Sequence, residues 1–341
     1  MRALVTGGAG FLGGAIARRL RARGDTVRSF SRGEYPALAE HGIETVKGDL
    51  ADRDEVARAV QGCDIVFHVA ARVGGWGPRA EFVRTNIDGT QHVIDACREA
   101  GVTRLVYTST PSVVHDAHDL EGADESLPYA PHFEAAYPET KARAEALVLG
   151  ANDATLATVA LRPHLVWGPG DNQLLPRLIE RARAGRLRFV GHGMNLVDAT
   201  YIDNAVDAHV LAGDRLAPGA SCAGRAYFIA NDEPRPAREL LEGVLAAAGV
   251  PAPSGEVSPR LAWLTGAAFE LVWKVLRRTD EPPLTRFAAR QLATAHWFDL
   301  AAAKRDLGYA PRIGTDEGLE RLRRCLAASE TAGQRISAPC R

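Results

Sequence analysis

The amino-acid sequence predicts an α/β protein with a doubly wound parallel sheet, followed by a smaller mixed domain. Through the first half of the 341-residue chain, short apolar runs alternate with amphipathic helical patterns. This alternation is typical of a parallel sheet whose two faces are covered by helices. In the second half the alternation stops, and proline- and glycine-rich stretches at 251–259 and 281–283 separate helical segments.

Five apolar runs are expected to form the strands of the parallel sheet. Each is followed by a helical pattern or a loop, as in consecutive βαβ units. The runs are ALVT (3–6), TVRSF (26–30), IVFHVA (65–70), RLVYTS (104–109) and TVALR (158–162). Such a sheet binds its ligand at the carboxyl ends of the strands. The residues that follow these runs are therefore the candidates for a binding site.

The first run leads into a glycine-rich turn that is typical of a dinucleotide-binding site. Gly7, Gly10 and Gly13 have the spacing GxxGxxG and stand between the strand and a helical pattern. Gly7 permits the tight turn, Gly10 lets the backbone approach a pyrophosphate, and Gly13 lets the helix pack closely. The start of the helix, at Phe11 and Leu12, supplies N–H groups to the phosphates. With a strand before it and a helix after it, this motif predicts a Rossmann-type sheet.

The end of the second run indicates which dinucleotide is bound. A protein of this fold that uses NAD(H) places an acidic residue there to bind the ribose 2′-hydroxyl. This chain has Ser31 and Arg32 instead. Arg32 can stack on adenine and pair with a 2′-phosphate, and Ser31 can donate a hydrogen bond. The sequence therefore favours NADP(H) over NAD(H). The alternative is that Arg32 is only a solvated charge in a loop.

A tyrosine and a lysine in the segment YPETK are candidates for proton transfer. Tyr137 and Lys141 are four residues apart, which places them on one face of a helix. Pro138 suits the first helical turn, so Tyr137 lies at the positive end of the helix dipole. The dipole and the lysine charge both favour the phenolate, and we expect them to lower the pKa of Tyr137 from about 10. Tyr137 can then protonate a carbonyl oxygen while a hydride arrives from a nicotinamide.

Hydroxyl groups gather where the fourth run leaves the sheet. They belong to Thr108, Ser109, Thr110 and Ser112. One of them is expected to hydrogen-bond the substrate oxygen and stabilise its developing charge. Serine and threonine also cluster in turns for structural reasons, so the others are expected to have that role.

Several segments, in order from about residue 2 to about residue 325, together resemble the extended short-chain dehydrogenase/reductase family. They are TGGAGFLG, the turn Gly48-Asp49-Leu50, His68-Val69-Ala70-Ala71, Asn86, YTST, YPETK, LRPHLVWGPGD (161–171), YIDNAVDAHV (201–210) and DLAAAKRDLGYAP (299–311). The resemblance implies that Thr110 is the catalytic hydroxyl, with Ser109 and Ser112 as alternatives. It also implies that Asn86 helps to hold a water near Lys141.

The same resemblance assigns further residues to the cofactor. Asp49 and Leu50 would flank the adenine, Ala70 and Ala71 would line the dinucleotide, and Pro163 and His164 would contact its carboxamide end. The expected catalytic residues are thus Thr110, Tyr137 and Lys141. The expected cofactor-binding residues are Gly7, Gly10, Phe11, Leu12, Gly13, Ser31, Arg32, Asp49, Leu50, Ala70, Ala71, Tyr137, Lys141, Pro163 and His164.

The segment RPHLVWGPGD resembles the branch of the family that is similar to 3β-hydroxysteroid dehydrogenases. Sugar-nucleotide epimerases and dehydratases have an asparagine where this chain has Leu165, which cannot bind a nucleotide diphosphate through a hydrogen bond. Within the branch, the segments around YPETK and the apolar insertion at 261–276 resemble bacterial reductases of 2-alkyl-3-oxoalkanoates in olefin biosynthesis. This implies NADPH-dependent reduction of a long-chain β-keto acid to the 2-alkyl-3-hydroxy acid. The first alternative is a hydroxysteroid or sterol dehydrogenase with the same Thr-Tyr-Lys chemistry. A sugar-nucleotide epimerase or dehydratase is a second, less favoured alternative.

These assignments predict how the chain is divided. Residues 1–165 and about 196–231 are expected to form the NADP-binding Rossmann domain. The substrate-binding domain is expected to comprise about 166–195 and 232–328. The tail at 329–341 has no periodicity, and we expect it to be disordered.

The longest apolar stretch, 261–276, is too short for a confident membrane span. It is predicted to be an amphipathic helix packed on the protein. A lid over an apolar substrate, a contact with a pathway enzyme and a peripheral membrane contact remain open.

Composition excludes some classes of protein. The formal net charge is −1 and no long basic run occurs, so we expect no nucleic-acid partner. The five scattered cysteines form no CxxC pair, which gives no zinc-site spacing, and we expect no metal. Their scatter and a strand beginning at residue 3 predict a cytoplasmic protein without a signal peptide. An apolar small-molecule substrate and a homodimer are the other expectations.

Overall fold

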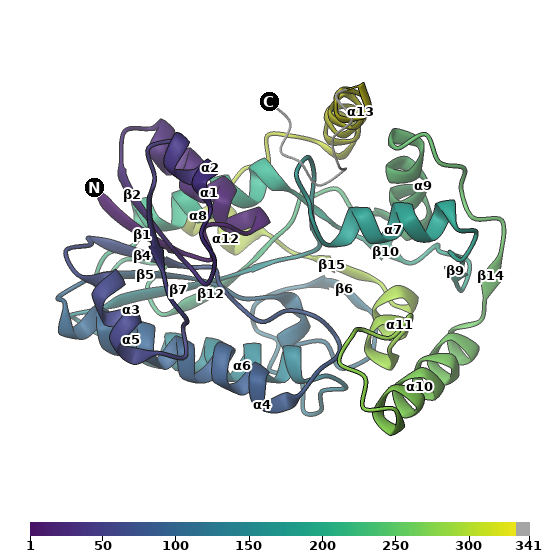
Figure 1. Ribbon diagram of the computed structural model, residues 1–341, viewed down its shortest axis with the longest axis horizontal. Coiled ribbons are helices and arrows are strands. Elements are labelled where there is room, and N and C mark those ends of the chain that lie inside the picture. Colours follow the sequence, from purple (N-terminus) through teal and green to yellow (C-terminus); the bar gives the residue numbers. More distant parts are fainter. Residues whose placement is uncertain (332–341) are drawn as a thin grey trace.

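The computed structural model describes residues 1–331 and is built on one large parallel sheet. Its seven strands lie in the order β12-β7-β5-β4-β1-β2-β3 (Figure 1). The strands are β1 (Arg2–Thr6), β2 (Thr26–Ser31), β3 (Glu44–Lys47), β4 (Ile65–His68), β5 (Arg104–Thr108), β7 (Ala157–Pro163) and β12 (Arg225–Ile229). Each adjacent pair is parallel. The predicted Rossmann-type sheet is therefore confirmed.

Two of the seven strands are additional to the five predicted runs. β3 is an edge strand with little burial, so its sequence ETVK carries no apolar run. β12 lies in the half of the chain where the strand–helix alternation stops. RLVYT is accordingly the fifth strand and not the fourth.

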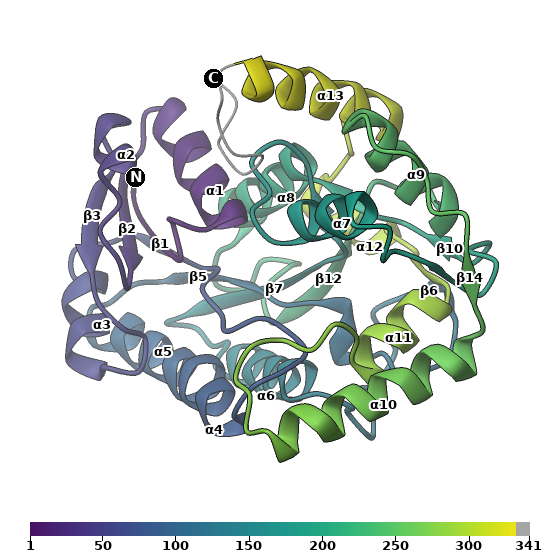
Figure 2. The same ribbon diagram turned by 45° about the vertical axis from the view of Figure 1, so that its right-hand side comes forward.

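Helices cover both faces of this sheet, as Figures 1 and 2 show. One face carries α1 (Phe11–Ala22), α8 (Ile202–Arg215) and α12 (Ala301–Leu307), with α2 (Pro36–Glu40) at its edge. The other carries α3 (Arg53–Val60), α5 (Gly89–Glu99) and α6 (Ala136–Gly150). α4 (Arg79–Phe82) and a π-helical segment, η1 (Val83–Asp88), lead into α5, and the 3₁₀ turn η2 (Pro111–Val113) follows β5.

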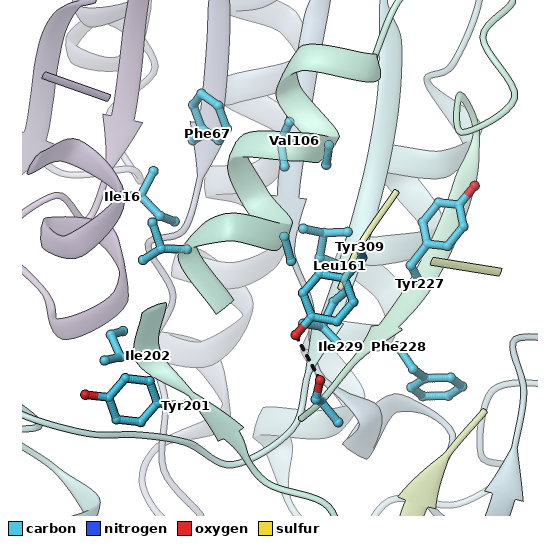
Figure 3. Packing of buried hydrophobic residues seen from close by; sticks show 14 of the residues in the cluster. Ile16, Phe67, Val106, Leu161, Tyr201, Ile202, Tyr227, Phe228, Ile229 and Tyr309 are labelled. Atoms are coloured by element: carbon cyan, nitrogen blue, oxygen red, sulfur yellow. Dashed lines mark hydrogen bonds between the residues drawn. The ribbon is translucent and has the colours of Figure 1, made fainter. Parts of the chain in front are cut away.

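The core lies in two apolar layers, one on each side of the sheet. Ala3 and Val5 of β1 belong to the layer beneath α1 and α8, whereas Leu4 belongs to the layer beneath α3, α5 and α6. This alternation follows from the two-residue period of a strand, and both faces are apolar because both are covered. Figure 3 shows the first layer, with Ile16 of α1 and Phe67 of β4.

A second, smaller sheet lies beyond the carboxyl edge of the first. Its strand order is β13-β10-β15-β6, with parallel and antiparallel pairs. Its strands are β6 (Leu120–Ala123), β10 (Leu196–Val197), β13 (Arg235–Pro236) and β15 (His296–Phe298). Two of them, β6 and β10, come from segments that the sequence assigns to the cofactor domain. The division into two domains stays a prediction.

The remaining elements surround the second sheet. Two short pairs, β8 with β11 and β9 with β14, add further strands. These elements are β8 (Val166–Trp167), β9 (Phe189–Val190), β11 (Thr200–Tyr201), β14 (Glu256–Val257), α7 (Leu174–Arg183), α9 (Ala237–Ala247), α10 (Pro259–Val275), α11 (Arg286–Ala293) and α13 (Thr315–Thr331).

The described residues cover only the first part of the predicted disordered tail at 329–341. α13 continues through 329–331, where the sequence analysis placed the start of a disordered tail. The rest of that tail lies outside the described residues. Within the described part of the chain, no helix has the length and apolar character that crossing a membrane requires. Cys63, Cys97 and Cys222 are buried free thiols.

Candidate active site

The glycine-rich turn joins β1 to α1 and is shaped by close backbone approaches. Gly7 has φ +69°, and a Cβ there would lie 2.9 Å from the Cα of Ala70. A Cβ on Gly13 would collide with the carbonyl oxygen of Gly7. No side chain caps the N-terminus of α1, which begins at Phe11 after Gly10. Its first N–H groups are thus available to an anion, and the turn fits the pyrophosphate of a dinucleotide.

The ends of β1 and β4 are fastened together behind this turn. The Thr6 hydroxyl accepts hydrogen bonds from the backbone N–H groups of Val69 and Ala70, each at 3.1 Å. The same hydroxyl contacts Nδ1 of His68 at 2.8 Å. Burial lowers the pKa of His68 to about 3, so its imidazole is neutral. This network fixes Ala70, and Ala71 after it, beside Gly7.

The adenine end of the predicted site lies where β2 ends. Arg32 is exposed, while the hydroxyl of Ser31 is buried and has no hydrogen-bond partner in the described structure. No acidic side chain directly follows the strand. A buried hydroxyl without a partner is uncommon, and it fits a ligand that hydrogen-bonds there.

Asp49 and Leu50 form the turn after β3, next to β2. The N–H of Asp49 donates to Glu55 at 2.8 Å, and its carboxylate accepts from the N–H of Ala51 at 3.0 Å. Leu50 is buried and packs against Gly89, where a Cβ would come within 2.8 Å of the leucine Cβ. The structure therefore places this turn at the same sheet edge as Ser31.

Tyr137 stands in the first turn of α6, which begins at Ala136. Burial raises the pKa of its phenol to about 12, against a lowering effect of the Thr110 hydroxyl. The prediction of a lowered pKa for Tyr137 is wrong for the protein without a bound ligand. The physical reason is that burial disfavours the phenolate and that the expected positive charge does not contact the phenol.

That charge belongs to Lys141, which points to the sheet. Its Nζ donates to the carbonyl oxygen of Thr108 at 2.6 Å and lies 4.1 Å from the centre of the Tyr107 ring. Burial lowers the pKa of Lys141 to about 7, against a raising effect of Glu145. The lysine is thus held beside the strand end, one helical turn from Tyr137.

The three candidate hydroxyls after β5 differ in their contacts. Thr110 lowers the pKa of the Tyr137 phenol, an effect that burial outweighs, and its hydroxyl accepts the N–H of Ser112 at 3.3 Å. The hydroxyl of Ser109 is buried without a partner in the described structure. Thr108 is engaged with Nε2 of His209 at 2.9 Å. Thr110 is accordingly the hydroxyl that the fold brings to the tyrosine.

Pro163 ends β7, and His164 follows it into the contact between the two sheets. Nδ1 of His164 lies 2.8 Å from the carbonyl oxygen of Asp198. Its ring packs edge-on against His296 and Phe298 of β15, and burial lowers its pKa to about 4. The imidazole is therefore neutral and turned toward the second sheet.

Asn86 is buried and hydrogen-bonds to two neighbouring segments, and its expected role in holding a water stays a prediction. Its amide nitrogen donates to the carbonyl oxygen of Arg72 and to the hydroxyl of Thr140, both at 3.0 Å. Its amide oxygen accepts from the N–H of Arg72 at 2.7 Å. Asn86 thus ties η1 to α6 in the turn that carries Lys141.

Sequence reasoning missed a buried ion pair behind the lysine. Glu145, one turn after Lys141, accepts hydrogen bonds from Arg162 of β7 at 2.6 and 3.1 Å. Tyr129 donates a third bond to this carboxylate at 3.0 Å. The signal was an arginine inside an apolar strand, because a charge buried in a sheet needs a partner.

Two cavities adjoin this edge of the sheet. One of about 560 Å³ lies beside Gly10 and Phe11. The other, of about 180 Å³, lies beside Pro138, next to Tyr137, and its walls include Phe133 and Phe287. The second is the nearer to the proton-transfer residues.

A Rossmann-type sheet, a glycine turn that fits a pyrophosphate, and a Thr-Tyr-Lys group at the same edge define an oxidoreductase acting on CH–OH or C=O groups. Residues 4–258 match the 3-beta hydroxysteroid dehydrogenase/isomerase family. The chain belongs to this family.

Three known proteins illustrate the match. The chain is 55% identical to the 2-alkyl-3-oxoalkanoate reductase of Stenotrophomonas maltophilia strain K279a, over 96% of this chain and 100% of the relative. It is 46% identical to the 2-alkyl-3-oxoalkanoate reductase of Shewanella oneidensis strain MR-1, over 95% of this chain and 86% of the relative. The solved structure of MoeE5 in complex with UDP-glucose and NAD matches with a TM-score of 0.72 and 26% sequence identity. The match covers 97% of this chain and 100% of the MoeE5 chain. These findings support a pyridine nucleotide as the cofactor.

Proposed function

We propose that this protein is an NADPH-dependent reductase that converts a long-chain 2-alkyl-3-oxoalkanoate into the 2-alkyl-3-hydroxyalkanoate. The observation that carries the proposal is the placement of Thr110, Tyr137 and Lys141 at the sheet edge that holds the glycine turn. The named relative that is 55% identical along its whole length supports the 3-oxo substrate.

The proposed reaction adds one hydride and one proton across a ketone. When bound, the reduced dinucleotide would supply the hydride to the carbonyl carbon. Tyr137 donates its proton to the carbonyl oxygen, and the hydroxyl of Thr110 hydrogen-bonds that oxygen and orients it. Lys141, when protonated, favours the tyrosinate that remains. The dinucleotide would be held by the glycine turn, by Ser31 and Arg32 at the adenine end, and by Ala70, Ala71 and Pro163 along its length.

The preference for NADPH rests on the end of β2. The exposed guanidinium of Arg32 and the unpartnered hydroxyl of Ser31 suit a 2′-phosphate. The two residues directly after the strand, Arg32 and Gly33, are not acidic, so no carboxylate stands there to repel that phosphate and bind a free ribose hydroxyl.

A hydroxysteroid or sterol dehydrogenase is the second candidate, because the description of the matching family names hydroxysteroids. A sugar-nucleotide substrate has less support. Leu165 occupies the position of the asparagine in that branch, and it is 45% exposed with φ +40°. Its side chain offers no hydrogen bond to a diphosphate.

The test measures NADPH consumption by the purified protein with a long-chain 2-alkyl-3-oxo acid, a 3-oxosteroid and a UDP-hexose. We expect kcat/KM to be highest for the oxo acid, with a product two hydrogens heavier by mass spectrometry. A higher kcat/KM for the steroid would replace the proposal by the second candidate. Activity restricted to the UDP-sugar would contradict both.

A further inference from the structure

Helix α10 lies at the outer edge of the molecule, next to α11 (Figures 1 and 2). Only Ala262 and Gly266 are buried along its 17 residues. A Cβ on Gly266 would come within 2.7 Å of the backbone of Thr285, so this side of α10 fits tightly against the start of α11. Glu270 reinforces the contact by an ion pair with Arg286 at 2.7 Å.

The opposite side of α10 is a row of exposed aliphatic side chains, here named the α10 stripe. The stripe consists of Leu261, Leu264, Leu271, Val272, Val275 and Leu276, which are 46–72% exposed. They make up six of the twelve large apolar side chains that are exposed in the described part of the chain. At 3.6 residues per turn they occupy less than half of the helix circumference, over a length of about 22 Å. A soluble monomer rarely exposes so continuous an apolar surface.

The charges around the stripe are positive. Arg260 stands at its beginning, and Lys274 and Arg277 stand at its end. All three are exposed, and none of them forms an ion pair with another described residue. The acidic residues nearby have other partners: Glu270 binds Arg286 and Asp280 binds Arg278. A chain with a net charge of −1 thus carries a local surface of uncompensated cations beside apolar side chains.

We propose that the α10 stripe docks on an anionic lipid membrane, with the helix lying in the plane of the surface. Leucine and valine would enter the acyl-chain boundary, and the three cations would reach phosphate headgroups along their aliphatic stems. A second copy of the chain fits less well, because a twofold contact through the stripe would bring these cations against one another. The proposal goes beyond the catalytic reaction and does not depend on it.

The charge and the apolar contributions can be measured separately. The full chain is sedimented with vesicles of phosphatidylcholine alone and of phosphatidylcholine mixed with phosphatidylglycerol. We expect binding to the mixed vesicles and little binding to the neutral ones, with a decline as salt is raised. Each cation contributes about fivefold to the affinity, so the double variant Lys274→Gln/Arg277→Gln should bind roughly 25-fold more weakly.

Leu271→Asp tests the apolar contact, and Leu292→Asp is the matched control, since Leu292 is 50% exposed on α11 outside the stripe. We expect Leu271→Asp to abolish vesicle binding, the control to retain it, and both to melt near the wild-type temperature. The proposal is overturned if wild-type protein does not bind the mixed vesicles or if the two variants lose binding equally. It is also overturned, in favour of a second copy, if Leu271→Asp instead converts a dimer into a monomer in light scattering.

Discussion

At the scale of single residues, Thr110 and Tyr137 carry the proposed proton transfer. Tyr137→Phe keeps the buried ring but removes the acidic hydroxyl, so we expect turnover to fall by about 100-fold or more. The dissociation constant for NADPH should stay within a few-fold of wild type. Thr110→Ala should also lose turnover, whereas Ser109→Ala should lose much less, because Thr110 and not Ser109 acts on the phenol of Tyr137. Near-wild-type turnover in Tyr137→Phe would contradict the mechanism.

Lys141 makes stability depend on pH in a predictable direction. Burial lowers its pKa from 10.5 to about 7. Below pH 7 both the folded and the unfolded protein carry the proton, and the cost of burying the charge is fully present. Between the two pKa values the unfolded state binds more protons, so the stability contributed at this site rises with pH. Lys141→Met should therefore be more stable than the wild type, and the difference in the free energy of unfolding should be largest at low pH.

The measurement is urea unfolding of both proteins at a series of pH values from about 6 to about 9. The free-energy difference between variant and wild type should shrink as the pH rises through about 7. A difference that is constant over this range would show that the folded lysine does not titrate there.

Arg32 is expected to decide between the two dinucleotides. Arg32→Ala removes a charge-assisted contact of about 1.5–3 kcal/mol, which corresponds to roughly ten- to a hundredfold in binding. We expect the KM for NADPH to rise by this factor and the KM for NADH to change little. An equal effect on both cofactors would indicate that Arg32 only stacks on adenine, and the preference for NADP(H) would be withdrawn.

At the scale of elements, the position of α6 depends on a buried ion pair. Glu145 is fully buried and its partner Arg162 is nearly so, and together they fasten α6 to β7 one turn beyond Lys141. Removing one partner leaves an uncompensated buried charge, which costs about 3–5 kcal/mol. Arg162→Met should therefore lower the free energy of unfolding by about that amount, as urea denaturation would show.

The matched control is the double variant Glu145→Leu/Arg162→Met. It removes both charges and should be more stable than Arg162→Met alone. If the single variant costs less than about 1 kcal/mol, the carboxylate is not buried as the structure describes.

At the scale of the whole molecule, the two sheets share one core. A single apolar cluster runs from Ala3 of β1 to Leu326 of α13, and it includes Phe298 of the second sheet. The chain also crosses between the sheets several times, since β6 and β10 lie between strands of the large sheet in sequence. We therefore expect the two sheets to unfold together.

Calorimetry tests this expectation. One transition should be seen, and NADPH at about 100 times its dissociation constant should stabilise the whole protein by about 2.7 kcal/mol. Two transitions, of which only one moves with NADPH, would mean that the second sheet unfolds independently.

Local patterns in the sequence predicted five of the seven strands of the large sheet and the sheet edge at which the candidate site lies. Runs such as IVFHVA and the glycine turn at Gly7–Gly13 report short-range requirements, namely burial on both faces and backbone without Cβ atoms. The edge strand β3 was not predicted, because it is hardly buried and its sequence therefore carries no such requirement.

Only the tertiary structure decided the contacts that depend on distant parts of the chain. It directs Lys141 to the carbonyl of Thr108, brings Thr110 and not Ser109 to Tyr137, and pairs Glu145 with Arg162. It also decides which side of α10 is covered, because α11 packs against Gly266 and leaves the stripe outside. The pKa values of Tyr137 and Lys141 follow the same rule: sequence spacing predicts which charges are near, but burial, which opposes both charged forms, is a property of the assembled fold.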